Sequence, residues 1–251
     1  MEKVIRFAEM IKESNNIVFF GGAGVSTESG VKDYRSKDGL YNTVKEYGAP
    51  PEKILSRTFL SRNPQVFYDF FRKYFTIDVE PNIAHKVLCE LEKMGKLNAV
   101  ITQNIDGLHQ KAGSTNVIEL HGTAKEFYCF SCGKKPDGEE VLNSIKEGHM
   151  PRCKYCGVLL KPNVVLYEES LNADVIEKAI NAISNADMLI IGGTSLVVQP
   201  AASFVGYFKG RHLVIINKTE TDFDNNAELV IRGKIGEVFE KTMREIKKIC
   251  H

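Results

Sequence analysis

Short apolar runs separated by amphipathic segments set the pattern of this chain. The apolar runs predict strands near residues 17–20, 98–102, 116–120, 163–166, 187–192 and 212–217. Amphipathic spacing predicts an opening helix on which Val4, Phe7, Ala8 and Ile11 share one face, and further helices over 82–94, 172–185, 199–209 and 236–249. Because strands alternate with helices, we expect an α/β fold with a mainly parallel, doubly wound sheet and right-handed crossovers.

Two segments interrupt this alternation. Residues 36–76 are rich in aromatic side chains and predict a loop followed by helices, and residues 124–162 contain four cysteines. We expect both to be insertions that build a small second domain facing the ligand-binding edge of the sheet. The predicted organisation is a discontinuous sheet domain made of residues 1–35, 77–123 and 163–251, a helical module at 36–76 and a metal-binding module at 124–162.

Composition and charge favour an ordinary soluble enzyme. The chain has 251 residues, 43% of them hydrophobic, and a net charge of +1 from 33 basic and 32 acidic residues. This balance gives no overall attraction to nucleic acid or to an anionic membrane, so we expect neither as a direct partner. The charged first ten residues do not resemble a signal peptide, and no apolar run approaches the length of a membrane span. We expect a cytoplasmic protein that is a monomer.

Four of the six cysteines form two tight pairs. Cys129 and Cys132 make one pair and Cys153 and Cys156 the other, each pair is followed by glycine, and twenty residues separate them. Two such pairs are typical of a closed tetrahedral thiolate site, which predicts one structural zinc; a redox or catalytic metal site is the alternative. For Cys89 and Cys250 we expect only a buried thiol and a thiol in the tail.

Polar and glycine-rich loops follow four of the predicted strands. They are Gly21–Gly30, Thr102–His109, Gly192–Leu196 and the pair Asn217 and Lys218. In open α/β sheets the carboxyl ends of the strands border the ligand crevice, so these loops predict one extended site along the sheet edge. The glycine loop taken alone lacks the full dinucleotide fingerprint, and a tight strand-to-helix turn would explain it as well.

The order of these motifs resembles the sirtuin family of NAD-dependent protein-lysine deacylases over essentially the whole chain. The matching pieces are GAGVSTESG at 22–30, Asp33-Tyr34-Arg35, TQNIDGLH at 102–109, His121-Gly122, the two cysteine pairs, Pro162-Asn163-Val164-Val165, Gly193-Thr194-Ser195-Leu196 and Ile216-Asn217. The resemblance implies a large Rossmann-type domain and a small domain containing zinc and helices. It also implies a cleft between them in which NAD and an acyl-lysine peptide meet.

The resemblance also implies roles for individual residues. His121 is expected to be the general base toward the ribose hydroxyls, because an imidazole can hold and release a proton near neutral pH. Asn104 is expected to orient the ribose or a water. The remaining residues expected around NAD are Gly22, Ala23, Gly24, Thr27, Asp33, Tyr34, Arg35, Gln103, Ile105, Asp106, Gly193, Thr194, Ser195, Asn217 and Lys218. The residues expected to contact the peptide are Val164, Val165, Leu166 and Tyr167.

Structural roles remain open for three of the polar residues. His121 could instead be a satisfied histidine closing the strand at 116–120. Asp106 could cap a helix that starts at Gly107, a role that is compatible with cofactor binding. His109 has the weaker claim to function, and we expect it to be structural.

The expected activity is NAD-dependent removal of acetyl, or longer apolar acyl, groups from protein lysine. The products implied are nicotinamide, O-acyl-ADP-ribose and free lysine. Two alternatives use the same site: transfer of ADP-ribose to a protein, and a binding module for NAD or ADP-ribose without catalysis. A pure binding module would not need a base such as His121 beside the ribose.

The chain departs from the family pattern at the cofactor loop and at the peptide segment. Val31-Lys32-Asp33-Tyr34-Arg35 stands where the family usually has Ile-Pro-Asp-Phe-Arg, so the loop loses a proline constraint. Tyr167-Glu168-Glu169 stands where an aromatic residue is usually followed by Gly-Glu, and a side chain at 168 is expected to narrow peptide access or change the strand angle.

The segment 36–76 carries an expectation about acyl choice. Relatives that remove succinyl or malonyl groups use a Tyr-x-x-Arg pair there. Residues Ile54, Phe59 and Asp69 stand three positions before the arginines Arg57, Arg62 and Arg72, so no such pair exists. The aromatic residues Phe67, Phe70, Phe71 and Tyr74 favour an apolar acyl channel, although about half of such residues at helical spacing are expected to be core.

Overall fold

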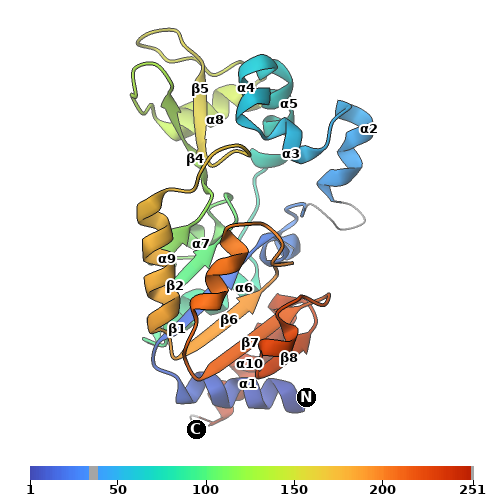
Figure 1. Ribbon diagram of the computed structural model, residues 1–251, viewed down its shortest axis with the longest axis vertical. Helices are drawn as coiled ribbons and strands as arrows, with labels where there is room; N and C mark the ends of the chain where they lie inside the picture. The colour runs from blue at the N-terminus through green and yellow to red at the C-terminus, as the bar shows by residue number, and fades with distance from the viewer. Residues whose placement is uncertain (34–38, 250–251) are drawn as a thin grey trace.

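A six-stranded parallel sheet organises the larger part of the molecule (Figure 1). The computed structural model describes residues 1–33 and 39–249. The strand order is β3-β2-β1-β6-β7-β8, and every pairing described in this sheet is parallel. The predicted doubly wound α/β fold is therefore confirmed. The strands are β1 (Ile17–Gly21), β2 (Leu97–Thr102), β3 (Val117–Glu119), β6 (Met188–Gly192), β7 (His212–Asn217) and β8 (Leu229–Arg232).

The central strands are apolar on both faces because helices cover both faces. In β1, Ile17 and Phe19 pack with helices α1 (Glu2–Glu13), α6 (Ile83–Lys93) and α10 (Ile235–Ile249). Val18 and Phe20 face the opposite side, toward α9 (Ala173–Asn185) and the 3-10 helix η4 (Ala201–Tyr207). All five residues of β1 are buried, which explains why its sequence shows a continuous apolar run rather than an alternation.

A second, two-stranded sheet corrects one predicted strand. The expected strand at 163–166 is not part of the large sheet; β5 (Leu160–Val164) pairs antiparallel with β4 (Gly122–Cys129). Pro162 has no N–H to donate, and a two-stranded ladder tolerates this more readily than a central strand would. The pattern also missed β4 and the short β8, and the helix expected over 199–209 is the 3-10 helix η4.

The two inserted segments share one core above the sheet (Figure 1). Phe67, Phe70 and Phe71 of α5 are buried, and Phe71 meets Phe127 of β4 edge to face. These three aromatics are core residues and leave only Tyr74 of the expected acyl channel outside the buried set. The helices of this part are η3 (Leu40–Thr43), α2 (Val44–Tyr47), α3 (Pro51–Ile54), α4 (Arg57–Arg62), α5 (Pro64–Phe75) and α8 (Gly138–Lys146).

Three short 3-10 segments and one helical turn complete the elements. They are η1 (Ala23–Val25), η2 (Thr27–Ser29), η5 (Asp224–Asn226) and α7 (Leu108–Lys111). None of the helices in the described ranges is long and apolar enough to cross a membrane.

The four paired cysteines come together at the end of β4. Their sulfur atoms all lie within 4.8 Å of one another, with Cys129 Sγ 3.4 Å from Cys156 Sγ and Cys132 Sγ 3.7 Å from Cys153 Sγ. Tetrahedral zinc with Zn–S bonds of about 2.3 Å requires sulfur atoms about 3.8 Å apart. The donor set and its spacing therefore fit one zinc ion with no coordination position left for substrate.

Each cysteine pair sits on a tight turn that presents backbone N–H groups to sulfur. Gly133 and Gly157 adopt φ values of 67° and 72°, which glycine reaches without strain, and their N–H groups bond to the carbonyls of Cys129 and Cys153. The N–H groups of Cys132 and Ser131 lower the pKa of Cys129 to about 6. The N–H groups of Tyr155 and Cys156 likewise lower the pKa of Cys153, so the turns favour the thiolate, the form that binds metal, at these two cysteines.

Removing one thiolate should unfold this module. We expect the protein to contain one zinc per chain, and Cys153→Ala to lose the metal and lower the melting temperature by about 5 °C or more, because binding of a structural metal contributes directly to folding. Ser131→Ala, between two ligands in sequence, is the matched control and should keep both zinc and stability. Elemental analysis and calorimetry of unchelated protein test this, and a zinc-free wild-type protein would contradict it.

Candidate active site

The candidate site lies where the order of the sheet reverses. From β1 the chain continues to β2 on one side, whereas β6 pairs on the other side of β1 and leads on to β7 and β8. The carboxyl ends of β1 and β6 therefore form the switch point at which open α/β sheets bind ligands. The loops predicted to form one extended site all leave strands at this edge.

The β1 and β6 loops pack backbone against backbone. The N–H of Gly24 donates to the carbonyl of Gly193 at 2.8 Å, and the N–H of Gly22 donates to that of Gly192 at 3.3 Å. A Cβ on Gly24 would lie 2.8 Å from the Cα of Gly193, and Gly193 has a φ of 59°. These glycines are thus required for contact between the loops themselves, apart from any approach to a cofactor.

The hydroxyl of Ser26 connects three polar groups of the site. It donates to Asp106 Oδ2 at 2.7 Å and accepts from Asn104 Nδ2 at 3.0 Å. His85 Nε2 lies 3.5 Å from the same oxygen. The backbone N–H of Asn82 donates to His85 Nδ1 at 3.3 Å, so neutral His85 carries its proton on Nε2, facing Ser26. The network fixes the amide of Asn104 through its nitrogen, and no side-chain or backbone group of the described residues donates to its oxygen.

Both carboxylate oxygens of Asp106 accept hydrogen bonds. Its Oδ1 accepts from the N–H of Leu108 at 2.9 Å, next to the start of α7, while Oδ2 binds Ser26. The N–H of Ala124 donates to the carbonyl of Ile105 at 2.9 Å and holds the neighbouring residue against β4. The helix-end bond thus orients the carboxylate that the resemblance assigns to the carboxamide.

Two neutral histidines support this network from below. His85 and His109 are fully buried, with ring centroids 4.7 Å apart. Burial lowers the pKa of His85 to about 4 and that of His109 to about 3, so both rings are uncharged at neutral pH. Neither ring nitrogen of His109 has a hydrogen-bond partner among the described residues, so this ring does not cap a helix start.

The imidazole of His121 has a defined orientation. It lies between β3 and β4, and its Nδ1 is 2.9 Å from the carbonyl oxygen of Gln103. Because a carbonyl can only accept, Nδ1 carries the proton and Nε2 is left with a lone pair. Burial lowers the pKa of His121, with a smaller opposing effect of the Gln103 bond, so the neutral base form dominates at pH 7.

Gln103, Thr194 and Asn217 form a second polar group across three strands. Gln103 Nε2 donates to Thr194 Oγ1 at 3.1 Å, and Asn217 Nδ2 donates to the carbonyl of Thr194 at 3.1 Å. The three strands that carry them are β2, β6 and β7, so the structure brings together residues about a hundred positions apart. Lys218, the next residue, is exposed.

The remaining residues predicted to bind the cofactor differ in where they lie and in the contacts they make. Thr27 Oγ1 donates to the carbonyl of Gly24 at 3.0 Å and stabilises the glycine loop. Ala23 and Ser195 are partly exposed beside it, and Asp33 lies at the end of the described loop. Tyr34 and Arg35 lie outside the described residues.

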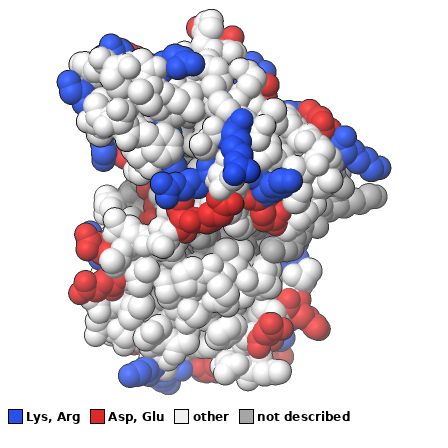
Figure 2. Space-filling model, turned by 45° about the horizontal axis from the view of Figure 1, so that its top comes forward, with Lys and Arg blue, Asp and Glu red and all other residues white. Residues whose placement is uncertain are grey.

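The expected peptide segment, residues 164–167, runs between the two parts of the molecule. Val165 donates its N–H to the carbonyl of His121 at 2.9 Å, and Tyr167 donates to the carbonyl of Leu55 at 3.0 Å. The segment thus contacts His121 at one end and the helical module at the other. On the face in Figure 2, Lys or Arg and Asp or Glu side chains gather together where the upper and lower parts meet, so this face has no single sign of charge.

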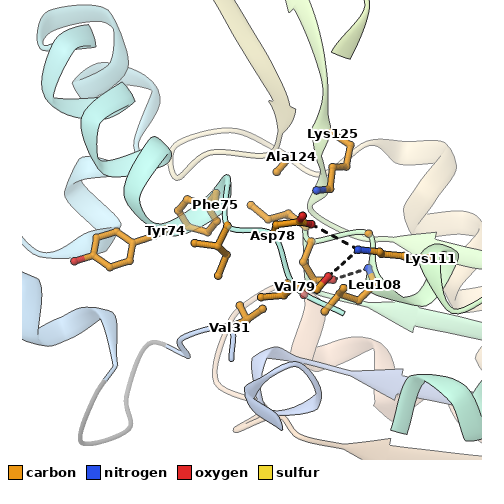
Figure 3. Close-up of a pocket in the computed structure, with 13 residues that line it drawn as sticks. Val31, Tyr74, Phe75, Asp78, Val79, Leu108, Lys111, Ala124 and Lys125 are labelled. Atoms are coloured by element: carbon orange, nitrogen blue, oxygen red, sulfur yellow. Dashed lines mark hydrogen bonds and ion pairs between the residues drawn. The ribbon is translucent and has the colours of Figure 1, made fainter. Parts of the chain in front are cut away.

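A cavity of about 90 Å³ opens beside Ile105 and Asp106 (Figure 3). Tyr74, Phe75 and Val79 give it an apolar side. Lys111 lies across from them and is bound to the carbonyl of Val79 at 3.0 Å and paired with Asp78 at 3.7 Å. The other residues that line the cavity are Val31, Ile77, Gly107, Leu108, Ala124 and Lys125.

Sequence reasoning missed the supporting residues of the site. Ser26 was part of a recognised motif but had no assigned role, and His85 was not considered. A usable signal for His85 was its place three residues after Asn82, at the start of a predicted helix, where the two form a capping box.

Comparison with known proteins places this architecture in a family. The family model described as the Sir2 family matches residues 22–200. The chain is 51% identical to a protein of Clostridium acetobutylicum, covering 96% of this chain and 98% of that one, and 52% identical to one of Clostridium perfringens, covering 96% and 99%. A protein of Fusobacterium nucleatum is 45% identical, covering 99% and 94%. All three are named NAD-dependent protein deacetylase.

Solved structures agree with this relationship. A Sir2 enzyme studied for its mechanism and regulation superposes with a TM-score of 0.90 at 38% identity, covering 99% of both chains. A Sir2 complex with a p53 peptide and NAD⁺ superposes with a TM-score of 0.85 at 38% identity, covering 96% of this chain and 97% of that one. The fold, the crevice and these comparisons together show that the chain belongs to the Sir2 family, the sirtuins.

Proposed function

We propose that this protein removes acetyl groups from lysine side chains of proteins with NAD as co-substrate, giving nicotinamide, O-acetyl-ADP-ribose and free lysine. The observation that carries the proposal is the orientation of His121: its Nδ1 donates to the Gln103 carbonyl, which leaves the lone pair on Nε2, at the same edge as the Ser26, Asn104 and Asp106 network. Relatives of similar length at 45–52% identity are named for this activity.

NAD fits the polar groups along the sheet edge. The glycine loop of β1 and the β6 loop would hold the phosphates, with Gln103, Thr194, Ser195, Asn217 and Lys218 toward the riboses. Ile105 and Asp106 would take the carboxamide, because the Asp106 carboxylate can accept from its NH₂ group. The proposed cofactor domain comprises residues 1–35, 77–123 and 163–251, and the modules at 36–76 and 124–162 close the site from above.

NAD supplies an electrophilic ribose carbon on which the acyl oxygen can displace nicotinamide. The chain's own contribution is to orient and to move a proton. Asn104, with its amide nitrogen committed to Ser26, presents its oxygen to a ribose hydroxyl or a water. His121 accepts a proton from a ribose hydroxyl at Nε2 while Nδ1 keeps its bond to Gln103.

The acyl-lysine partner would lie along residues 164–167. Val164, Val165, Leu166 and Tyr167 join His121 to the helical module, so a peptide beside them would bring its acyl-lysine toward the base. We propose that the protein acts as a monomer in the cytoplasm, where reducing conditions keep zinc-ligating cysteines as thiols.

Replacing the proposed base tests the function directly. His121→Ala should lower kcat for NAD-dependent deacetylation by about 100-fold or more, the usual size of a general-base effect, while peptide binding is retained. The matched control is His149→Ala, a histidine whose side chain is 69% exposed, and it should leave kcat unchanged. Mass spectrometry of an acetyl-lysine peptide with and without NAD gives the rates. Full activity of the His121 variant would sink the mechanism.

The lowered pKa of His121 predicts the acid side of the pH profile. A base must be unprotonated, and a pKa below the ordinary value of about 6.5 keeps the imidazole neutral to lower pH. The midpoint of the acid limb of log kcat/KM should therefore lie below pH 6.5. The mechanism would be contradicted by an acid limb with its midpoint above pH 7 that is still present in His121→Ala. In that case another group would be the base.

Acyl choice should favour apolar groups. In the helical module, the residues three positions before Arg57, Arg62 and Arg72 are Ile54, Phe59 and Asp69, so no Tyr-x-x-Arg pair is available to an acidic acyl group. An acidic acyl tail would lose hydration without a bidentate cation to replace it, so kcat/KM for succinyl-lysine should be at least about tenfold below that for acetyl-lysine. One peptide carrying acetyl, myristoyl or succinyl groups decides this, and a preference for succinyl would overturn it.

A further inference from the structure

The peptide segment ends in a turn with an unusual backbone. The N–H of Glu169 donates to the carbonyl of Leu166 at 3.0 Å, closing a four-residue turn. Glu168, the third residue of this turn, has a φ of 74°, a left-handed conformation that glycine adopts far more readily. The side chain at position 168 is therefore accommodated in a turn that favours glycine.

The side chain of Glu168 bonds to the helical module. Its Oε2 accepts from the backbone N–H of Thr58 at 2.9 Å, in the first turn of α4. The hydrogen bonds from Thr58 also lower the pKa of Glu168, so the carboxylate is charged at neutral pH. Orphan N–H groups at a helix start favour an anionic acceptor, which gives the side chain a reason to stay in this position.

Backbone bonds run beside this side-chain bond. Arg57 donates its N–H to the carbonyl of Tyr167 at 3.1 Å, and Tyr167 donates to the carbonyl of Leu55 at 3.0 Å. Ser56 and Tyr167 form an isolated parallel bridge. The turn is thus attached to the start of α4 by two backbone bonds and one carboxylate, and the carboxylate alone depends on the identity of residue 168.

The other side of the turn is held by a buried ion pair. Lys161, whose side chain is 2% exposed, lies 2.9 Å from Glu169 Oε2, and the same oxygen accepts from the N–H of Leu166 at 2.9 Å. Residues 166–169 are therefore fixed from β5 by Lys161 and from α4 by Glu168. The Glu168 contact therefore adds to the two backbone bonds of Tyr167 in fixing where α4 lies relative to the peptide segment.

We propose that Glu168 is a positioning residue, which ties α4 to residues 164–167 and so sets the geometry of the channel for the acyl-lysine peptide. This inference rests on the proposed function, because it concerns the peptide site of that reaction. Glu168 does not touch the reacting atoms, and its carboxylate is already bound to Thr58. Its effect should appear in peptide recognition and not in the chemical step.

Three substitutions separate positioning from plain stability. Glu168→Gln keeps an oxygen that can accept from Thr58, Glu168→Ala removes the acceptor and keeps the strained φ, and Glu168→Gly removes the acceptor and relieves the strain. Glu168→Ala should have the lowest melting temperature, and Glu168→Gly should melt higher than Glu168→Ala because glycine tolerates the left-handed turn.

KM for the peptide should depend on whether residue 168 has an oxygen that accepts from Thr58, and not on the melting temperature of the variant. We expect KM for an acetyl-lysine peptide to rise about fivefold in both Glu168→Ala and Glu168→Gly, the size typical of one lost charge-assisted hydrogen bond at a surface. KM in Glu168→Gln should stay within about twofold of wild type, as should kcat and KM for NAD in all three variants. An unchanged peptide KM in Glu168→Gly, or a KM that rises only in the least stable variant, would overturn the proposal.

Amide hydrogen exchange gives a readout that does not need activity. Exchange at Thr58 and across Leu166–Glu169 should be faster in the Ala and Gly variants and close to wild type in the Gln variant. Equal protection in all four proteins would contradict the tie between α4 and the turn. A wild-type protein that is inactive on acetyl-lysine peptides but shows the expected exchange pattern would refute the proposed function and leave the structural role of Glu168 intact.

Discussion

The backbone contact between the β1 and β6 loops is the constraint on which the candidate site depends. The bond from the Gly24 N–H to the Gly193 carbonyl, 2.8 Å long, joins the two sides of the sheet at its switch point. A Cβ at Gly24 would overlap Gly193, so any larger residue would push the loops apart. Ser26 follows Gly24 by two residues, and its bonds to Asn104 and Asp106 require this close packing. Glycine at position 24 is therefore required for the packing of the β1 loop against the β6 loop, whether or not a cofactor is bound.

Burial keeps the histidines of the site neutral, and hydrogen bonds orient the polar side chains. His85 and His109 are neutral beneath the Ser26 network, and His121 is neutral with its proton on the side of Gln103. Asp106 is oriented by two donors, Ser26 and the N–H of Leu108. A neutral imidazole and an oriented carboxylate thus lie at the same sheet edge.

The sequence predicted the parts of the fold whose burial is uniform. β1, β2, β6 and β7 are apolar runs buried on both faces, and helix and strand alternation was enough to infer the parallel sheet. The run at 163–166 looked the same locally but belongs to a two-stranded ladder, because pairing partners are chosen by distant residues such as those of β4. The zinc cluster was predictable because metal geometry limits ligand spacing.

Predicting the site from sequence was limited by the same non-local contacts. Ser26 and His85 are 59 positions apart, and no local pattern indicates that they meet. Glu168 was recognisable as a departure from the family, but neither its left-handed φ nor its bond to Thr58 could be inferred from the pattern. The family resemblance supplied the candidate residues, and the structure supplied the hydrogen bonds that orient them.

The most direct test of the account is the stoichiometry of the reaction. Purified protein would be incubated with NAD and an acetyl-lysine peptide, and nicotinamide, deacetylated peptide and acetylated ADP-ribose would be quantified in the same samples. The account predicts equal amounts of all three, and no nicotinamide release above background when the peptide is omitted. Nicotinamide release that is independent of the peptide, or free acetate as the primary acyl product, would contradict it.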